Sequence, residues 1–212
     1  MISLVEKLVR TSKTGIFTFG DALSLDGGSR GAVRMALTRS VQSGDVVRIR
    51  RGLYCLASEV APVLPHPYVL ANLAYGPSYI SMETALEYHG WIPEAVHNVF
   101  SITNSRGRRF VTPFGLFRYE CVKQGPLMAG VDRVDTEPSG TFFIASPLKA
   151  LCDIVVTRHL DWTGIDPLEE SLRIERESLE RLSAADFDRL AEVYYSKRAA
   201  RFLAALKKEL SL

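Results

Sequence analysis

The chain has 212 residues, of which 47% are hydrophobic and 24% charged, and its formal net charge is +2. This composition provides enough apolar material for a core without metal or disulfide staples, and it excludes a disordered chain, a collagen-like repeat and a coiled-coil rod. Apolar runs are too short for a membrane span, and the amino terminus lacks the basic-then-apolar order of a signal peptide. We therefore expect a cytoplasmic protein whose three cysteines, Cys55, Cys121 and Cys152, are free thiols.

The positive charge is concentrated at the amino-terminal end. Residues 1–57 hold nine basic and four acidic residues, a formal charge of +5, whereas the rest of the chain holds 17 basic and 20 acidic residues. A basic segment of this size is typical either of a polyanion-binding surface or of a simply solvated face. The elements that carry these charges decide between the two interpretations.

Three helices are expected in this basic segment, over residues 2–12, 18–25 and 30–42, with a short extended link at 15–17. The run Asp26-Gly27-Gly28 breaks the second helix, and Ser29 is a good N-cap for the third. Gly44 provides the stop of the third helix.

A two-stranded hairpin is expected directly afterwards, with strands at 46–50 and 53–56 around a reversal at Arg51-Gly52. Alternation places Val47 and Ile49 inward and Arg48 and Arg50 outward. Three helices followed by a basic hairpin form the pattern of a winged helix-turn-helix.

A proline-rich stretch at residues 61–67 is the best candidate for a linker. After it we expect helices at 67–75, 82–89 and 146–157, a wholly helical segment from 165 onward, and strands at 98–103, 110–111, 115–122, 128–132 and 141–144. The predicted fold class is α+β, with an N-terminal winged helix-turn-helix joined to a mixed α/β C-terminal domain that ends in a helical bundle. The expected domains are residues 1–60 and 61–212, the second being β-rich over 97–145 and helical over 146–212.

Candidate DNA-binding residues lie on the third helix and on the hairpin. An α-helix fits the major groove, where arginine can bind the O6 and N7 atoms of guanine with both arms. Arg30 and Arg34 are therefore candidates for base contacts, Thr38 is a secondary candidate, and Arg39 flanks this face. Ser29 at the helix N-terminus could meet a phosphate, and the hairpin would place three further arginines over the DNA backbone: Arg48, Arg50 and Arg51. The alternative interpretation is that these residues form an ordinary solubilising surface.

A catalytic or metal site is not expected. The four histidines show no zinc-binding spacing, and His89 is more typical of a helix end that caps carbonyl groups. Phosphate-binding glycine loops and nucleophile motifs are absent. An acidic group at Asp132, Asp135 and Glu137 could hold Mg²⁺ in a nuclease, but a solvated loop is the preferred interpretation. Asp153, in an apolar helical run, is interpreted as structural and needs a nearby arginine or backbone amides as partners.

Four segments, in this order along the chain, resemble blocks of the AbiEi-type antitoxin family: residues 47–54 (VRIRRGLY), 79–91 (YISMETALEYHGW), 99–103 (VFSIT) and 146–153 (SPLKALCD). The resemblance spans the chain from about Leu4 to Leu210. It implies a bacterial or phage-borne antitoxin of the type IV toxin–antitoxin class, without a cofactor and without a catalytic set of its own.

The resemblance also implies the partners. The winged helix would bind inverted repeats in the promoter of its own operon and repress it, and the C-terminal domain would counter a nucleotidyltransferase toxin of the AbiEii type. Because this class does not require direct contact with the toxin, such contact is not assumed. Two alternatives remain at this point: a protein-interaction antitoxin that sequesters the toxin without binding DNA, and a Mg²⁺-dependent nuclease that uses the acidic group.

Overall fold

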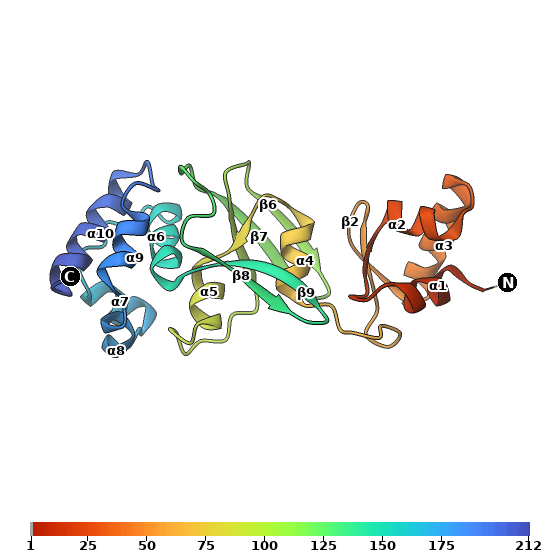
Figure 1. Ribbon diagram of the computed structural model, residues 1–212, viewed down its shortest axis with the longest axis horizontal. Helices are drawn as coiled ribbons and strands as arrows, with labels where there is room; N and C mark the ends of the chain where they lie inside the picture. Colours follow the sequence, from red (N-terminus) through yellow and green to blue (C-terminus); the bar gives the residue numbers. More distant parts are fainter. Residues whose placement is uncertain (1) are drawn as a thin grey trace.

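The computed structural model describes residues 2–212 and is elongated, with the two chain ends at opposite ends of the molecule (Figure 1). Three parts follow one another along the long axis. The first is a three-stranded sheet with three helices, the second a six-stranded sheet with flanking helices, and the third a helical end (Figure 1). This arrangement confirms the predicted α+β class.

The amino-terminal part contains three helices and three strands: α1 (Leu4–Thr11), β1 (Ile16–Thr18), α2 (Phe19–Asp26), α3 (Arg30–Gln42), β2 (Val46–Arg50) and β3 (Leu53–Leu56). The strands form an antiparallel sheet in the order β1-β3-β2. Capping boxes begin α1 and α2, and the Ser29 hydroxyl accepts a hydrogen bond from the Ala32 amide to begin α3. The helices and the β2–β3 hairpin have the winged helix-turn-helix arrangement that the sequence predicts.

Both faces of this small sheet are covered, which the sequence prediction missed. Val46 and Leu56 pack into a core with α1, α2 and α3, whereas Ile49, Leu53 and Cys55 belong to the larger core of the following part. Val47 and Ile49 are directed inward, as predicted, but the core that they face is this second one. The wing is thus supported from behind by the rest of the chain.

The middle part is a mixed sheet in the order β6-β7-β5-β4-β9-β8, in which β4 pairs parallel with β9 and β5 parallel with β7. Its strands are β4 (Tyr79–Ile80), β5 (Val99–Thr103), β6 (Arg108–Thr112), β7 (Gly115–Cys121), β8 (Val131–Thr136) and β9 (Gly140–Ala145). Two helices, α4 (Pro67–Ala74) and α5 (Met82–Tyr88), pack against β5 and β9.

Two strand predictions were wrong. The short strand β4 was missed because two buried residues carry no alternation that a pattern could detect. The strand predicted at 128–132 begins later, at Val131, because residues 126–129 form a turn in which the Ala129 amide donates to the Pro126 carbonyl. Asp132 and Asp135 therefore lie on β8 and not in the predicted loop.

The helical end is built from α6 (Pro147–Thr157), α7 (Asp166–Leu172), α8 (Arg176–Glu180), α9 (Ala184–Leu190) and α10 (Lys197–Glu209). Ala199, Leu203 and Leu206 of α10 are buried, as their spacing predicts. The helical segment expected from residue 165 onward is interrupted after Leu190, where α9 ends and Ala191 is exposed. None of the helices within residues 2–212 is both long and apolar enough to span a membrane.

The three cysteines are free thiols, in agreement with the sequence prediction. Cys55 and Cys152 are buried and Cys121 is exposed. Burial raises the pKa of the Cys55 thiol to about 12, so this thiol stays protonated at neutral pH and packs as a small apolar group.

Candidate nucleic-acid interface

A groove of about 500 Å³ lies between α3 and the β2–β3 hairpin. We call it the arginine groove, because four of its lining residues are arginines and none is acidic. The arginines are Arg30 and Arg34 from α3, and Arg48 and Arg51 from the hairpin; the other lining residues are Phe19, Leu37, Thr38, Val41, Gln42, Gly52 and Tyr54.

Helix α3 presents its basic face to the groove because its opposite face is buried. Val33 and Leu37 are almost completely buried in the amino-terminal core. Arg30 and Arg34 are four residues apart, so they lie on neighbouring turns of the exposed face. Thr38 follows one turn later, and its hydroxyl donates to the Arg34 carbonyl at 2.9 Å. The Thr38 hydroxyl therefore donates its proton inside the helix, and its oxygen can still accept a hydrogen bond from a ligand.

The hairpin supplies the other wall. Arg48 pairs with Tyr54 across the β2–β3 ladder and points to the same side of the sheet as α3. Gly52 has φ of +84°, a conformation that the tight reversal after Arg51 requires and that a residue with a side chain rarely adopts. The Gly52 carbonyl accepts a hydrogen bond from the Phe19 amide at 3.1 Å, which ties the hairpin turn to the start of α2.

The positive charge of this part is not neutralised internally. Within residues 2–212, none of the seven arginines between residues 2 and 57 forms an ion pair with a carboxylate. The four carboxylates of the same segment have other partners: Glu6 and Asp21 cap helices, Asp26 pairs with Lys7, and Asp45 accepts from Ser43. By contrast, seven arginines of residues 58–212 are ion-paired. The unpaired guanidinium groups make the arginine groove a site of positive potential.

The structure brings together five of the eight predicted DNA-binding residues and separates three. Arg30, Arg34, Thr38, Arg48 and Arg51 all line the arginine groove. The others do not line it. Ser29 caps α3. Arg39 is exposed near the C-terminal end of α3, where its positive charge interacts favourably with the helix dipole.

Arg50 is the clearest difference from the predicted wing. Its guanidinium donates to the Arg51 carbonyl at 2.9 Å and to the Leu73 carbonyl of α4 at 3.4 Å. The register of the β2–β3 ladder shifts between Arg48 and Arg50, so these residues do not follow the simple alternation expected of the strand. The Arg50 side chain is directed toward the middle part of the molecule.

Several groove residues were missed by the sequence analysis. Val41 is apolar, but it lies eight residues after the buried Val33, which rotates it about 80° away from that position on the helix. Tyr54 could have been found from its alternation with the buried Leu53 and Cys55. Phe19 gave no local signal, because its place in the groove depends on contacts between α2, α3 and the hairpin.

The acidic residues that suggested a nuclease are not gathered into a site. Asp132 and Asp135 are three apart on β8, and an odd spacing on a strand directs side chains to opposite faces. Asp135 pairs with Arg133 at 2.9 Å and also accepts from the Thr141 hydroxyl. Among residues 2–212, no group of three or more His, Cys, Asp or Glu side chains could hold a metal ion.

Asp153 has a different set of partners from those expected. It is fully buried on α6 and accepts hydrogen bonds from the hydroxyls of Tyr79 at 2.9 Å, Ser81 at 2.6 Å and Tyr194 at 2.7 Å. Lys149, also fully buried, donates to the Gln124 side chain at 2.8 Å and lies 5.0 Å from the ring centroids of both tyrosines.

Burial dominates the electrostatics of this cluster. It raises the pKa of Asp153, an effect opposed by Lys149 and the three hydroxyls, and it lowers the pKa of Lys149. The cluster joins β4, α6 and the segment before α10, and it supports the structural interpretation of Asp153. His89, expected to cap carbonyls at its own helix end, instead has Nε2 2.9 Å from the Ala145 carbonyl oxygen on β9.

Comparison with known proteins gives a family match for the amino-terminal part. The model of a family described as transcriptional regulator, AbiEi antitoxin, matches residues 3–57, which contain α1 to β3 and all lining residues of the arginine groove. No curated protein matches the chain. The family match supports a role as a transcriptional regulator or antitoxin. It confirms the resemblance predicted from the sequence over residues 3–57, which include the block at residues 47–54. Residues 3–57 are therefore similar to the AbiEi antitoxin family of transcriptional regulators.

Proposed function

We propose that this protein is a DNA-binding antitoxin of a type IV toxin–antitoxin system, which represses its own operon and counteracts a nucleotidyltransferase toxin of the AbiEii type. The DNA-binding part of this proposal rests on the arginine groove. Its four guanidinium groups lie between a recognition helix and a wing, and none has a carboxylate partner among residues 2–212. The family match of residues 3–57 supports both the DNA-binding role and the antitoxin role. We place this function in the cytoplasm, where the promoter of a bacterial or phage-borne operon lies.

The proposed binding mode inserts α3 into the major groove of duplex DNA. Arg30 and Arg34 then approach base edges, and Thr38 lies one turn further along the same face. Arg48 and Arg51 contact phosphates from the wing, where they add affinity without reading sequence. Ser29 and Arg39 are assigned to flanking phosphates. Arg50 reaches the DNA backbone only if its hydrogen bond to the Leu73 carbonyl opens.

We also propose that residues 1–60 act as the DNA-binding domain and residues 61–212 as the antitoxin domain, without a catalytic role of its own. Two separate hydrophobic cores support this division. The buried Ile49, Leu53 and Cys55 contribute to the core of residues 61–212, so the wing depends on the second domain for its support.

The salt dependence of promoter binding tests the DNA-binding half. With about six phosphate contacts, the logarithm of the affinity of the full-length protein for its own promoter duplex should fall with the logarithm of salt concentration with a slope near −5. Titrations followed by fluorescence anisotropy between about 50 and 200 mM NaCl measure this slope. A duplex of the same length and shuffled sequence is the control, and it should bind at least about 10³-fold more weakly. A slope near zero, or equal affinity for both duplexes, would contradict the proposal.

A further inference from the structure

Phe19 contacts both walls of the arginine groove. Its ring centroid lies 5.5 Å from the guanidinium carbon of Arg30 on α3. Its backbone amide donates to the carbonyl of Gly52 in the hairpin turn at 3.1 Å. One residue at the start of α2 thus connects the recognition helix to the wing.

The position of Phe19 is itself well fixed. The preceding residue, Thr18, pairs with Leu53 in the three-stranded sheet and forms a capping box with Asp21. The Phe19 ring is partly buried against the amino-terminal core. These contacts leave the ring little freedom, so it can act as a rigid platform for a flexible neighbour.

The Arg30 side chain has few other contacts that would fix its position. It is the first residue of α3, it is exposed, and within residues 2–212 it has no carboxylate partner. No acidic residue lies in the first turn of α3, and a cation at a helix N-terminus is unfavourable for the helix dipole. The aromatic face of Phe19 provides an attractive contact for the guanidinium, which would otherwise sample many rotamers.

We propose that Phe19 is a positioning residue that determines base discrimination by Arg30. The ring holds the guanidinium of Arg30 at the mouth of the groove, and the amide holds the hairpin turn at a defined distance from α3. This inference rests on the proposed DNA-binding function and goes beyond it, because it assigns specificity to a side chain that does not itself read a base.

A set of Phe19 variants tests the inference by anisotropy titration of full-length protein. The probes are the promoter duplex and the same duplex changed at the base pair where Arg30→Ala has its largest effect. Phe19→Leu should reduce the affinity ratio between the two duplexes by about two- to thirtyfold, the range that a cation–π contact accounts for. Phe19→Tyr keeps an aromatic face and should retain the wild-type ratio. In an Arg30→Ala background, Phe19→Leu should change the ratio no further.

A measurement without DNA separates positioning from general loss of structure. In wild type and Phe19→Tyr, ring currents should shift the Arg30 Hε resonance upfield in NMR spectra, and this shift should disappear in Phe19→Leu while the core resonances stay in place. If wild type binds the promoter but Phe19→Leu keeps the full ratio, or if its effect persists without Arg30, the positioning role is wrong. If wild type does not bind the promoter selectively, the proposed function itself fails and the inference with it.

Discussion

Replacing Arg30 and Arg34 together by alanine is expected to weaken binding of the full-length protein to its promoter duplex by about 2–6 kcal/mol, a loss of at least about 30-fold in affinity. Both side chains line the arginine groove from α3 and have no carboxylate partner among residues 2–212. Their removal costs the base contacts that the proposed mode assigns to them, and it costs little folding energy because both are exposed. Anisotropy titrations at one fixed salt concentration measure the loss.

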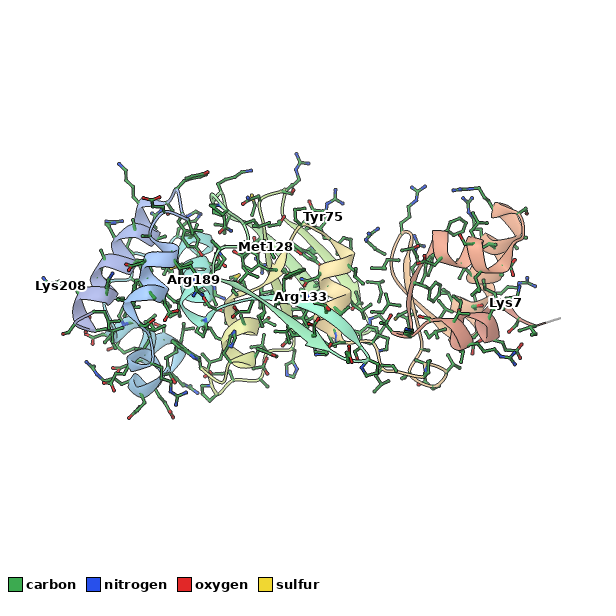
Figure 2. The ribbon with its side chains drawn as sticks, in the orientation of Figure 1. Lys7, Tyr75, Met128, Arg133, Arg189 and Lys208 are labelled. Atoms are coloured by element: carbon green, nitrogen blue, oxygen red, sulfur yellow. The ribbon has the colours of Figure 1, made fainter. Side chains whose placement is uncertain are left out.

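Two further variants make this result interpretable. Arg189→Ala removes an exposed arginine of α9, far from the groove at the other end of the molecule from Lys7, and should leave affinity unchanged (Figure 2). Replacing Arg30 and Arg34 by lysine keeps the charge but removes the two-armed geometry, so selectivity should fall while binding to shuffled DNA persists. Equal weakening on promoter and shuffled duplexes by the alanine pair would mean that these residues contact phosphates and not bases.

The largest expected effect on stability is at Asp153. We expect Asp153→Ala to lower the free energy of unfolding by about 3–5 kcal/mol. The substitution leaves the hydroxyls of Tyr79, Ser81 and Tyr194 without their shared acceptor, and it leaves the buried Lys149 without a compensating charge. Urea denaturation followed by circular dichroism measures the change.

Asp135→Ala is the matched control for this substitution. Asp135 is exposed on β8 and pairs with Arg133, so its removal should cost less than about 1 kcal/mol. Asp153→Asn retains an acceptor oxygen and the size of the side chain, and should lose less stability than Asp153→Ala. Comparable losses for Asp153→Ala and Asp135→Ala would contradict a stabilising role for the buried cluster.

The elements of the recognition unit were predictable because their signals are local. Ser29 as N-cap and the glycines on either side gave the bounds of α3, and apolar alternation gave β2 and β3. The exposed face of α3 also followed from helical periodicity, since Val33 and Leu37 had to be buried. The sequence therefore predicts that Arg30, Arg34 and Thr38 share this exposed face, and all three line the arginine groove.

The remaining features depend on contacts between distant segments. The Arg50 side chain is directed toward Leu73 because the hairpin packs on α4. The sequence around either residue does not predict this contact. The partners of Asp153 come from positions 79, 81 and 194, so only its need for partners could be predicted. The position of Phe19 in the groove likewise depends on tertiary contacts, with Arg30 and Gly52, that the sequence does not predict.

Backbone chemical-shift mapping of the full-length protein with its promoter duplex tests the central claim most directly. If α3 occupies a DNA groove and the hairpin lies over the backbone, the largest amide shifts will fall on residues 29–42 and 48–54, with Phe19 among them. Shifts that cluster instead on β8 or α10 and leave α3 unchanged would show that the unpaired arginines do not form the binding surface.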